Sequence, residues 1–165
     1  MKEKLKSRKL AVGGLLTAII ALLTAYVKIP LPIGFAHIGD GAVIFSGIML
    51  GFYGAIPAAL GSALGDILAG YSYYAVFSAV IKGVMALIAA KWIMFHEQAS
   101  FRNMMIVVAA FAFMTIAYFL TNTFLYSFPQ AVASIFGDGM QAAVGAVISS
   151  VILKLEPRLA RLVMR

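Results

Sequence analysis

Residues 37–82 read HIGDGAVIFSGIMLGFYGAIPAALGSALGDILAGYSYYAVFSAVIK, and the organisation of the chain follows from them. It is almost wholly apolar and rich in glycine, yet it carries Asp40, Asp66 and Lys82. In a membrane protein, ionisable side chains at apolar depth are costly and mark functional sites. We therefore expect the rest of the chain to form a frame that holds these polar groups.

The overall composition agrees with a membrane protein. The chain has 165 residues, of which 63% are hydrophobic and only 12% are charged. A soluble domain of this length needs much more polar surface. We predict an all-α, polytopic membrane protein with a single domain over residues 1–165.

Six apolar segments have about the length of a transmembrane helix, which is roughly 17–25 residues. The predicted spans are residues 9–27, 38–52, 55–69, 75–95, 104–124 and 130–153. Two prolines, Pro30 and Pro32, interrupt helix in the loop before the second span. The second and third spans are short, and a single re-entrant hairpin is an alternative for them.

The basic residues predict the orientation of the bundle. They gather before the first span, after the last span and beside the loop that joins the fourth and fifth spans: Lys2, Lys4, Lys6, Arg8, Lys9, Lys91, Arg102, Lys154, Arg158, Arg161 and Arg165. Loops rich in lysine and arginine stay on the cytoplasmic side. We therefore expect both termini in the cytoplasm of a bacterial cell, with the chain in its cytoplasmic membrane. The net charge of +7 reflects this topology and does not indicate a nucleic-acid partner.

The polar residues of the later spans lie at comparable depths. Lys82 comes eight residues after Tyr74, and Asp138 comes nine residues after Pro129, which places both about 12–13 Å from the outer turns. We predict that Lys82 and Asp138 pair or share a ligand. Asp40 is expected near the outer mouth.

Helical spacing places several polar side chains on common faces, such as Tyr118 with Asn122. Together they predict an outward-open pocket for a small polar heteroaromatic ligand. The predicted substrate-binding residues are His37, Asp40, Asp66, Tyr74, Ser78, Lys82, Tyr118, Asn122, Asp138 and Gln141. Three structural alternatives stay open: the lysine–aspartate pair only fixes helix register, Asp66 bonds helix backbone, and His37 is an interfacial loop residue.

Catalytic motifs are absent from the sequence. It has no G-x-x-x-x-G-K-[ST], H-E-x-x-H or G-x-S-x-G, so neither ATP binding through a P-loop nor these hydrolytic chemistries are expected. With two histidines and no cysteine, a metal site is also not expected. We predict transport or ligand capture without a cofactor, and no enzymatic activity.

A set of glycine-containing motifs resembles a known family. These are IPLP at 29–32, HIGDG at 37–41, GFYGA at 51–55, GSALGD at 61–66, GY at 70–71 and VIKG at 80–83. They resemble the substrate-binding S components of energy-coupling factor (ECF) vitamin transporters, in the riboflavin-transporter-like branch that includes hydroxymethylpyrimidine and pyridoxine proteins. The resemblance implies six helices and a vitamin captured from outside under the outer loops.

The same resemblance implies partners and a substrate. The partners are a transmembrane coupling (T) subunit and two ATP-binding subunits, with Gly14 and Ala18 on the face of the first helix that meets the coupling subunit. The implied substrate is a small vitamin or precursor such as hydroxymethylpyrimidine or pyridoxine, with riboflavin or another vitamin as the alternative. Two other classes stay open: a stand-alone secondary transporter with an ion relay through Asp66, Lys82 and Asp138, and a structural membrane subunit.

Overall fold

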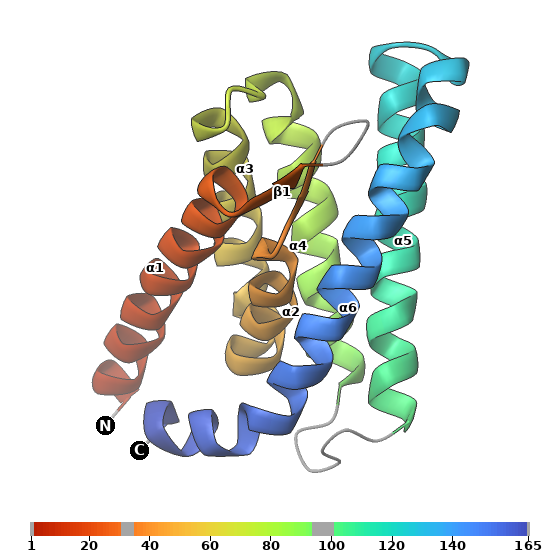
Figure 1. The fold of residues 1–165 in the computed structure, drawn as a ribbon. Helices are drawn as coiled ribbons and strands as arrows, with labels where there is room; N and C mark the ends of the chain where they lie inside the picture. Colours follow the sequence, from red (N-terminus) through yellow and green to blue (C-terminus); the bar gives the residue numbers. More distant parts are fainter. Residues whose placement is uncertain (1, 31–34, 94–100, 165) are drawn as a thin grey trace.

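The computed structural model describes residues 2–30, 35–93 and 101–164, with side chains for residues 7–27, 37–93 and 101–154. Parts of the predicted outer loop (31–34) and of the predicted cytoplasmic loop (94–100) lie outside these residues. The elements are α1 (Lys2–Tyr26), β1 (Lys28–Pro30), β2 (Phe35–His37), α2 (Gly39–Leu50), η1 (Gly51–Gly54), α3 (Ala55–Leu68), η2 (Ser72–Tyr74), α4 (Ala75–Trp92), α5 (Phe101–Leu125) and α6 (Phe128–Met164). The prediction of a helical bundle is confirmed, and the described residues add one short hairpin to it (Figure 1).

Five helical stretches within the described residues are long and apolar enough to cross a membrane. One of them, Gly39–Leu68, contains both α2 and α3. These two helices have 12 and 14 residues, or about 18 and 21 Å, and the hydrocarbon core is about 30 Å thick. Six separate crossings therefore stay a prediction. The chain reverses between α2 and α3 at η1, where Gly51 has a φ of 61°, a value that glycine adopts without strain.

Helix α2 forms the centre of the bundle. All but one of its residues are buried, and it packs against α1, α3, α4 and α6. At its end, the Ser46 hydroxyl donates to the carbonyl of Gly54 at 2.9 Å, which ties the helix to η1. A helix enclosed on all sides has no need of a polar face, and α2 is apolar all round apart from its small and functional residues.

A β-hairpin places α2 at its depth. Strands β1 and β2 are antiparallel, with Lys28 opposite His37. The hairpin descends from the end of the bundle that holds η2 into its interior, so α2 begins well inside the bundle (Figure 1). Non-helical backbone is tolerated at membrane depth only where protein or an aqueous cavity surrounds it.

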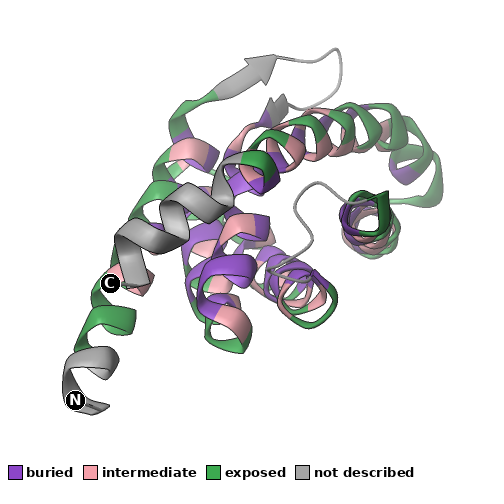
Figure 2. Cartoon of the chain, turned by 90° about the horizontal axis from the view of Figure 1, so that it is seen from below, coloured by how far each residue is buried: buried purple, intermediate pink, exposed green. Residues whose placement is uncertain are grey.

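The outward faces of the helices are exposed and apolar. Leu22 of α1, Leu60 of α3 and Ile116 of α5 are each more than half exposed. Buried residues gather on the inward faces of the same helices (Figure 2). Exposed apolar side chains on the outward faces are typical of helices that face lipid.

The two ends of the bundle differ in what they hold. Helix α1 begins, α4 ends, α5 begins and α6 ends at the same end of the bundle (Figure 1). The predicted sixth span of residues 130–153 is shorter than the helix, because α6 continues to Met164. The opposite end carries η2 and the turn between α5 and α6.

Close packing of the helices in the centre of the bundle depends on glycine. A Cβ on Gly47 would lie 2.2 Å from the Ala86 carbonyl oxygen of α4, whereas a Cβ on Gly14 would meet nothing within 4 Å. We expect Gly47→Ala to destabilise the protein by about 1–3 kcal/mol, because α2 and α4 must separate. Gly14→Ala is the matched control and should be neutral or slightly stabilising. Thermal unfolding of the detergent-purified variants, followed by circular dichroism, measures both. An unchanged midpoint for Gly47→Ala would contradict the proposed close contact.

Candidate functional site

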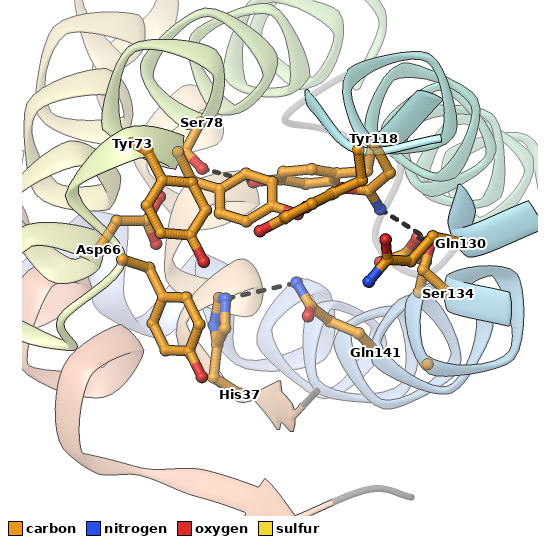
Figure 3. A pocket seen from close by; sticks show the side chains of 14 residues that line it. His37, Asp66, Tyr73, Ser78, Tyr118, Gln130, Ser134 and Gln141 are labelled. Carbon is orange, nitrogen blue, oxygen red and sulfur yellow. Dashed lines mark hydrogen bonds between the residues drawn. The ribbon is translucent and has the colours of Figure 1, made fainter. Parts of the chain in front are cut away.

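A cavity of about 330 Å³ opens at the end of the bundle that holds η2 and the α5–α6 turn (Figure 3). We call it the pocket. Side chains from β2, α3, η2, α4, α5 and α6 surround it. Its lining residues are His37, Asp66, Tyr71, Tyr73, Tyr74, Ser78, Tyr118, Asn122, Tyr126, Gln130, Ser134, Gly137, Asp138 and Gln141.

Helical periodicity explains how three helices supply these groups. Tyr74, the last residue of η2, lies four residues before Ser78 in the first turn of α4, and Tyr118 and Asn122 lie one turn apart near the end of α5. On α6 the lining residues follow a single stripe, 130, 134, 137, 138 and 141. Each helix therefore presents one polar stripe to a common space.

Tyrosine rings form much of the wall. The centroids of Tyr73 and Tyr74 are 4.9 Å apart, and Tyr74 lies 6.4 Å from Tyr118. Tyr126 lies 6.3 Å from Tyr73, edge to face, and so joins the α5 end to the α3–α4 connection. Such rings offer stacking surfaces with polar tips to a planar ligand.

Hydrogen bonds connect α4, α5 and α6 around the pocket. The Tyr74 hydroxyl donates to Asn122 Oδ1, and Asn122 Nδ2 donates to Ser134 Oγ at 2.8 Å. Ser134 in turn lies 3.1 Å from Asp138 Oδ2. The hydroxyls of Ser78 and Tyr118 are 2.8 Å apart. These bonds hold the side chains of the pocket in fixed orientations before a ligand binds.

A buried ion pair lies beneath the pocket. Lys82 Nζ donates to Asp40 Oδ1 at 2.6 Å, and the two side chains are 1% and 0% exposed. Lys82 also lies 2.9 Å from Met114 Sδ and 5.2 Å from the Tyr118 ring centroid. An ammonium group in this position is therefore enclosed by a carboxylate, a thioether and an aromatic face.

Two predictions about these charges are wrong. Lys82 pairs with Asp40 and not with Asp138, and Asp40 lies in the interior and not at the outer mouth. A ligand shared by Lys82 and Asp138, the alternative to a direct pair, stays a prediction. The hairpin carries the start of α2 inward, which brings Asp40 to the depth of Lys82. The α5–α6 turn also stands further out than η2 (Figure 1), so counting residues from each turn does not give equal depths for Lys82 and Asp138.

The remaining predicted binding residues all line the pocket: His37, Asp66, Tyr74, Ser78, Tyr118, Asn122, Asp138 and Gln141. Of the ten predicted residues, only Asp40 and Lys82 lie below the pocket and do not line it. Gln141 connects this ion pair to the pocket, because its Nε2 is 2.8 Å from Asp40 Oδ2 and 3.3 Å from His37 Nε2. The sequence reasoning missed Tyr71, Tyr73, Tyr126, Gln130, Ser134 and Gly137 as lining residues. The i, i+4, i+8 spacing of Gln130, Ser134 and Asp138 is the signal that could have found the α6 members.

The lining of the pocket is acidic. Asp66 and Asp138 contribute carboxylates, and among the described residues that line it there is no lysine or arginine. The described part of the chain also contains no group of three His, Asp or Glu side chains placed to hold a metal ion. The arrangement can bind a planar ligand by stacking and hydrogen bonding.

The predicted partner face lies elsewhere on the molecule. Gly14 and Ala18 are exposed, on the side of α1 that faces away from the bundle. By contrast, Ala21 and Ala25, further along α1, are buried, and α1 packs closely against the glycines of α3. The small residues of α1 therefore divide into an internal set and an external set.

Comparison with known proteins agrees with this architecture. A profile of the family described as "ECF-type riboflavin transporter, S component" matches residues 4–156. An archaeal relative, described as "Uncharacterized protein in gap 3'region" of Pyrococcus woesei, is 30% identical over 132 residues, which cover 78% of this chain and 88% of the relative. The chain therefore belongs to the ECF-type riboflavin transporter S component family, whose members are multi-pass membrane subunits for vitamin uptake and not enzymes.

Proposed function

We propose that the chain is the substrate-capture subunit of an ATP-driven vitamin importer in the cytoplasmic membrane. It binds a small vitamin or precursor from the outside and delivers it through a transmembrane coupling subunit that works with two ATP-binding subunits. The observation that carries this proposal is the pocket of tyrosines, amides and carboxylates at the end opposite the chain termini. Family membership supports the same role.

The size of the pocket favours a single-ring ligand. Its volume of about 330 Å³ lies at the lower end of the range for small-molecule sites, about 300–1,000 Å³. A pyrimidine or pyridine with hydroxymethyl groups, such as hydroxymethylpyrimidine or pyridoxine, suits this space. The ring stacks on tyrosine, and its hydroxyl groups bond to the polar stripes of α5 and α6.

The charge of the pocket favours a neutral or cationic ligand. With Asp66 and Asp138 in the lining and Lys82 enclosed beneath it, an anionic ligand would meet like charges without a cationic partner. Like-charge juxtaposition in a desolvated site is strongly unfavourable. Phosphorylated or carboxylated vitamers are therefore disfavoured relative to their uncharged forms.

Riboflavin is the second candidate substrate. The match to the riboflavin-transporter profile favours it, because that match spans residues 4–156. Riboflavin is uncharged and planar, as the pocket requires, but its three fused rings and ribityl chain need more space than a single ring.

The deciding experiment is mass spectrometry of the small molecule that co-purifies with the detergent-solubilised chain, followed by calorimetric titration with pyridoxine, hydroxymethylpyrimidine and riboflavin. We expect tight binding of one of these by the isolated chain. Uptake into proteoliposomes that requires the coupling and ATP-binding subunits supports the importer, and uptake by the isolated chain alone would instead indicate a secondary transporter. Failure to bind any of the three would contradict the proposal.

Tyr74 provides a test of stacking in the pocket. Tyr74→Ala should weaken binding by about fivefold, because an aromatic contact contributes on the order of 1 kcal/mol. Tyr74→Phe retains the ring and should keep most of the affinity. Calorimetry of both variants measures the difference; equal losses in the two variants would show that the hydroxyl, which donates to Asn122, and not the stacking of the ring accounts for the affinity.

The exposed face of α1 that carries Gly14 and Ala18 provides a test of the coupling interface. Gly14→Leu or Ala18→Leu should abolish uptake by the assembled transporter and leave ligand binding by the isolated chain intact, because both positions are exposed and neither lines the pocket. Ala112→Leu, at an exposed position of α5, is the matched control and should retain uptake. Loss of ligand binding in the α1 variants would instead make this face structural.

A further inference from the structure

The ion pair beneath the pocket fixes the orientation of the Gln141 side-chain amide above it. Asp40 accepts from Lys82 at 2.6 Å with its Oδ1, and its Oδ2 lies 2.8 Å from Gln141 Nε2. A carboxylate paired with an ammonium group is ionised and can only accept hydrogen bonds. The nitrogen of the Gln141 amide, and not its oxygen, must therefore face Asp40.

Both amide hydrogens of Gln141 are then used inside the protein. One is donated to Asp40, and the other faces His37 Nε2 at 3.3 Å. An amide nitrogen does not accept hydrogen bonds, so His37 Nε2 is the acceptor and the neutral ring carries its hydrogen on Nδ1. The only hydrogen-bonding atom that Gln141 retains for a ligand is Oε1.

The two polar residues nearest to Gln141 on the same side of α6, Ser134 and Asp138, also have no donor to offer. Ser134 Oγ accepts from Asn122 Nδ2 at 2.8 Å. Its single hydrogen goes to the Ala131 carbonyl, at 2.9 Å, or to Asp138 Oδ2, at 3.1 Å. The ionised form of Asp138 can only accept hydrogen bonds. We call Ser134, Asp138 and Gln141 the α6 wall.

From this count we infer that the pocket selects a ligand that presents hydrogen-bond donors to the α6 wall, because the wall offers only acceptors. The inference rests on the proposed function, namely that a vitamin binds in this pocket. The ligand class that matches best is a heteroaromatic ring with an exocyclic amine. Rings that carry only acceptors at the corresponding edge, above all carboxylates, are excluded because they leave acceptor facing acceptor.

The inference gives Asp40 and Lys82 a defined role. Neither lines the pocket, and both are almost completely buried. They are positioning residues that act through the amide of Gln141. Without the ionised carboxylate, the amide can rotate by half a turn and present its nitrogen to the ligand.

The test compares ligands that share a ring and differ in one substituent. Calorimetric titration of the full-length chain uses one set of pyridines: pyridoxine, which has a hydroxymethyl donor at C4, 4-deoxypyridoxine, which has a methyl group there, and 4-pyridoxate. The second set is 4-amino-5-hydroxymethyl-2-methylpyrimidine and the same pyrimidine without its amino group. We expect the aminopyrimidine to bind at least about tenfold more tightly than the pyrimidine without its amino group, 4-deoxypyridoxine to bind more weakly than pyridoxine, and 4-pyridoxate to bind most weakly.

The outcomes separate the inference from the proposed function. If the chain binds these rings with no preference for the amine, the inference is wrong and the proposed function stands. If it binds riboflavin and none of these rings, the equivalent comparison is riboflavin against 3-methylriboflavin, which lacks the N3 hydrogen; equal affinities would overturn the inference. If no vitamin binds, the proposed function fails first.

The positioning role is tested by the double variant Asp40→Asn/Lys82→Met. It removes both buried charges together and leaves every pocket-lining residue in place. We expect the preference for the amine to fall at least about threefold, because the introduced asparagine amide can donate or accept and no longer fixes Gln141. Lys91→Met, on the exposed part of α4, is the control and should keep the preference.

A second variant keeps the positioning role testable if the double variant does not fold. Gln141→Met removes the acceptor oxygen at similar side-chain size and leaves the ion pair in place. It should also reduce the preference for the amine. An unchanged preference in a folded Asp40→Asn/Lys82→Met or Gln141→Met protein would overturn the role assigned to the α6 wall.

Discussion

The contact between Lys82 and Asp40 is the constraint on which the rest of the structure depends. It joins α4 to α2 in the centre of the bundle, and through Gln141 and Met114 it reaches α6 and α5. Removing two charges from water is expensive, so such a pair adds little net stability compared with apolar packing. Removing one partner alone costs about 3–5 kcal/mol. The pair therefore acts mainly by allowing one arrangement of the four helices.

Around this contact, helices α1–α4 are held together in one way, and helices α5 and α6 join them in another. Helices α1–α4 approach one another through glycines: a Cβ on Gly61 or Gly65 would meet α1 at less than 3 Å, and one on Gly47 would meet α4. Because lipid tails are as apolar as leucine, such close van der Waals contact is what joins helices in a membrane. Helices α5 and α6 join the same apolar core through residues such as Phe111, Met114 and Leu153, and they add the polar contacts of the pocket. The binding site thus adds polar contacts to an apolar core that all six helices share.

The sequence predicted the helices better than it predicted the centre. Apolar segment length located α2 and α3 to within two residues, and four-residue spacing identified the faces that carry Tyr74 with Ser78 and Tyr118 with Asn122. The position of Asp40 could not be derived this way, because nothing in residues 28–37 reveals that a hairpin carries the start of α2 inward. The partner of Lys82 depends on that depth, so it was missed for the same reason. The tyrosines at 71, 73 and 126 lie in connections, where periodicity carries no information about direction.

The distance in sequence between the members of the ion pair has a consequence for biogenesis. Asp40 is synthesised 42 residues before Lys82 and 101 residues before Gln141. During that interval a nascent α2 in the hydrocarbon would hold a carboxylate without its final partners, which is unfavourable. At about 18 Å, the helix is also shorter than the hydrocarbon core, which is about 30 Å thick. The most favourable order is therefore late docking: α2 enters the bundle together with α3, and its position becomes permanent only when α4 and then α6 have left the translocon.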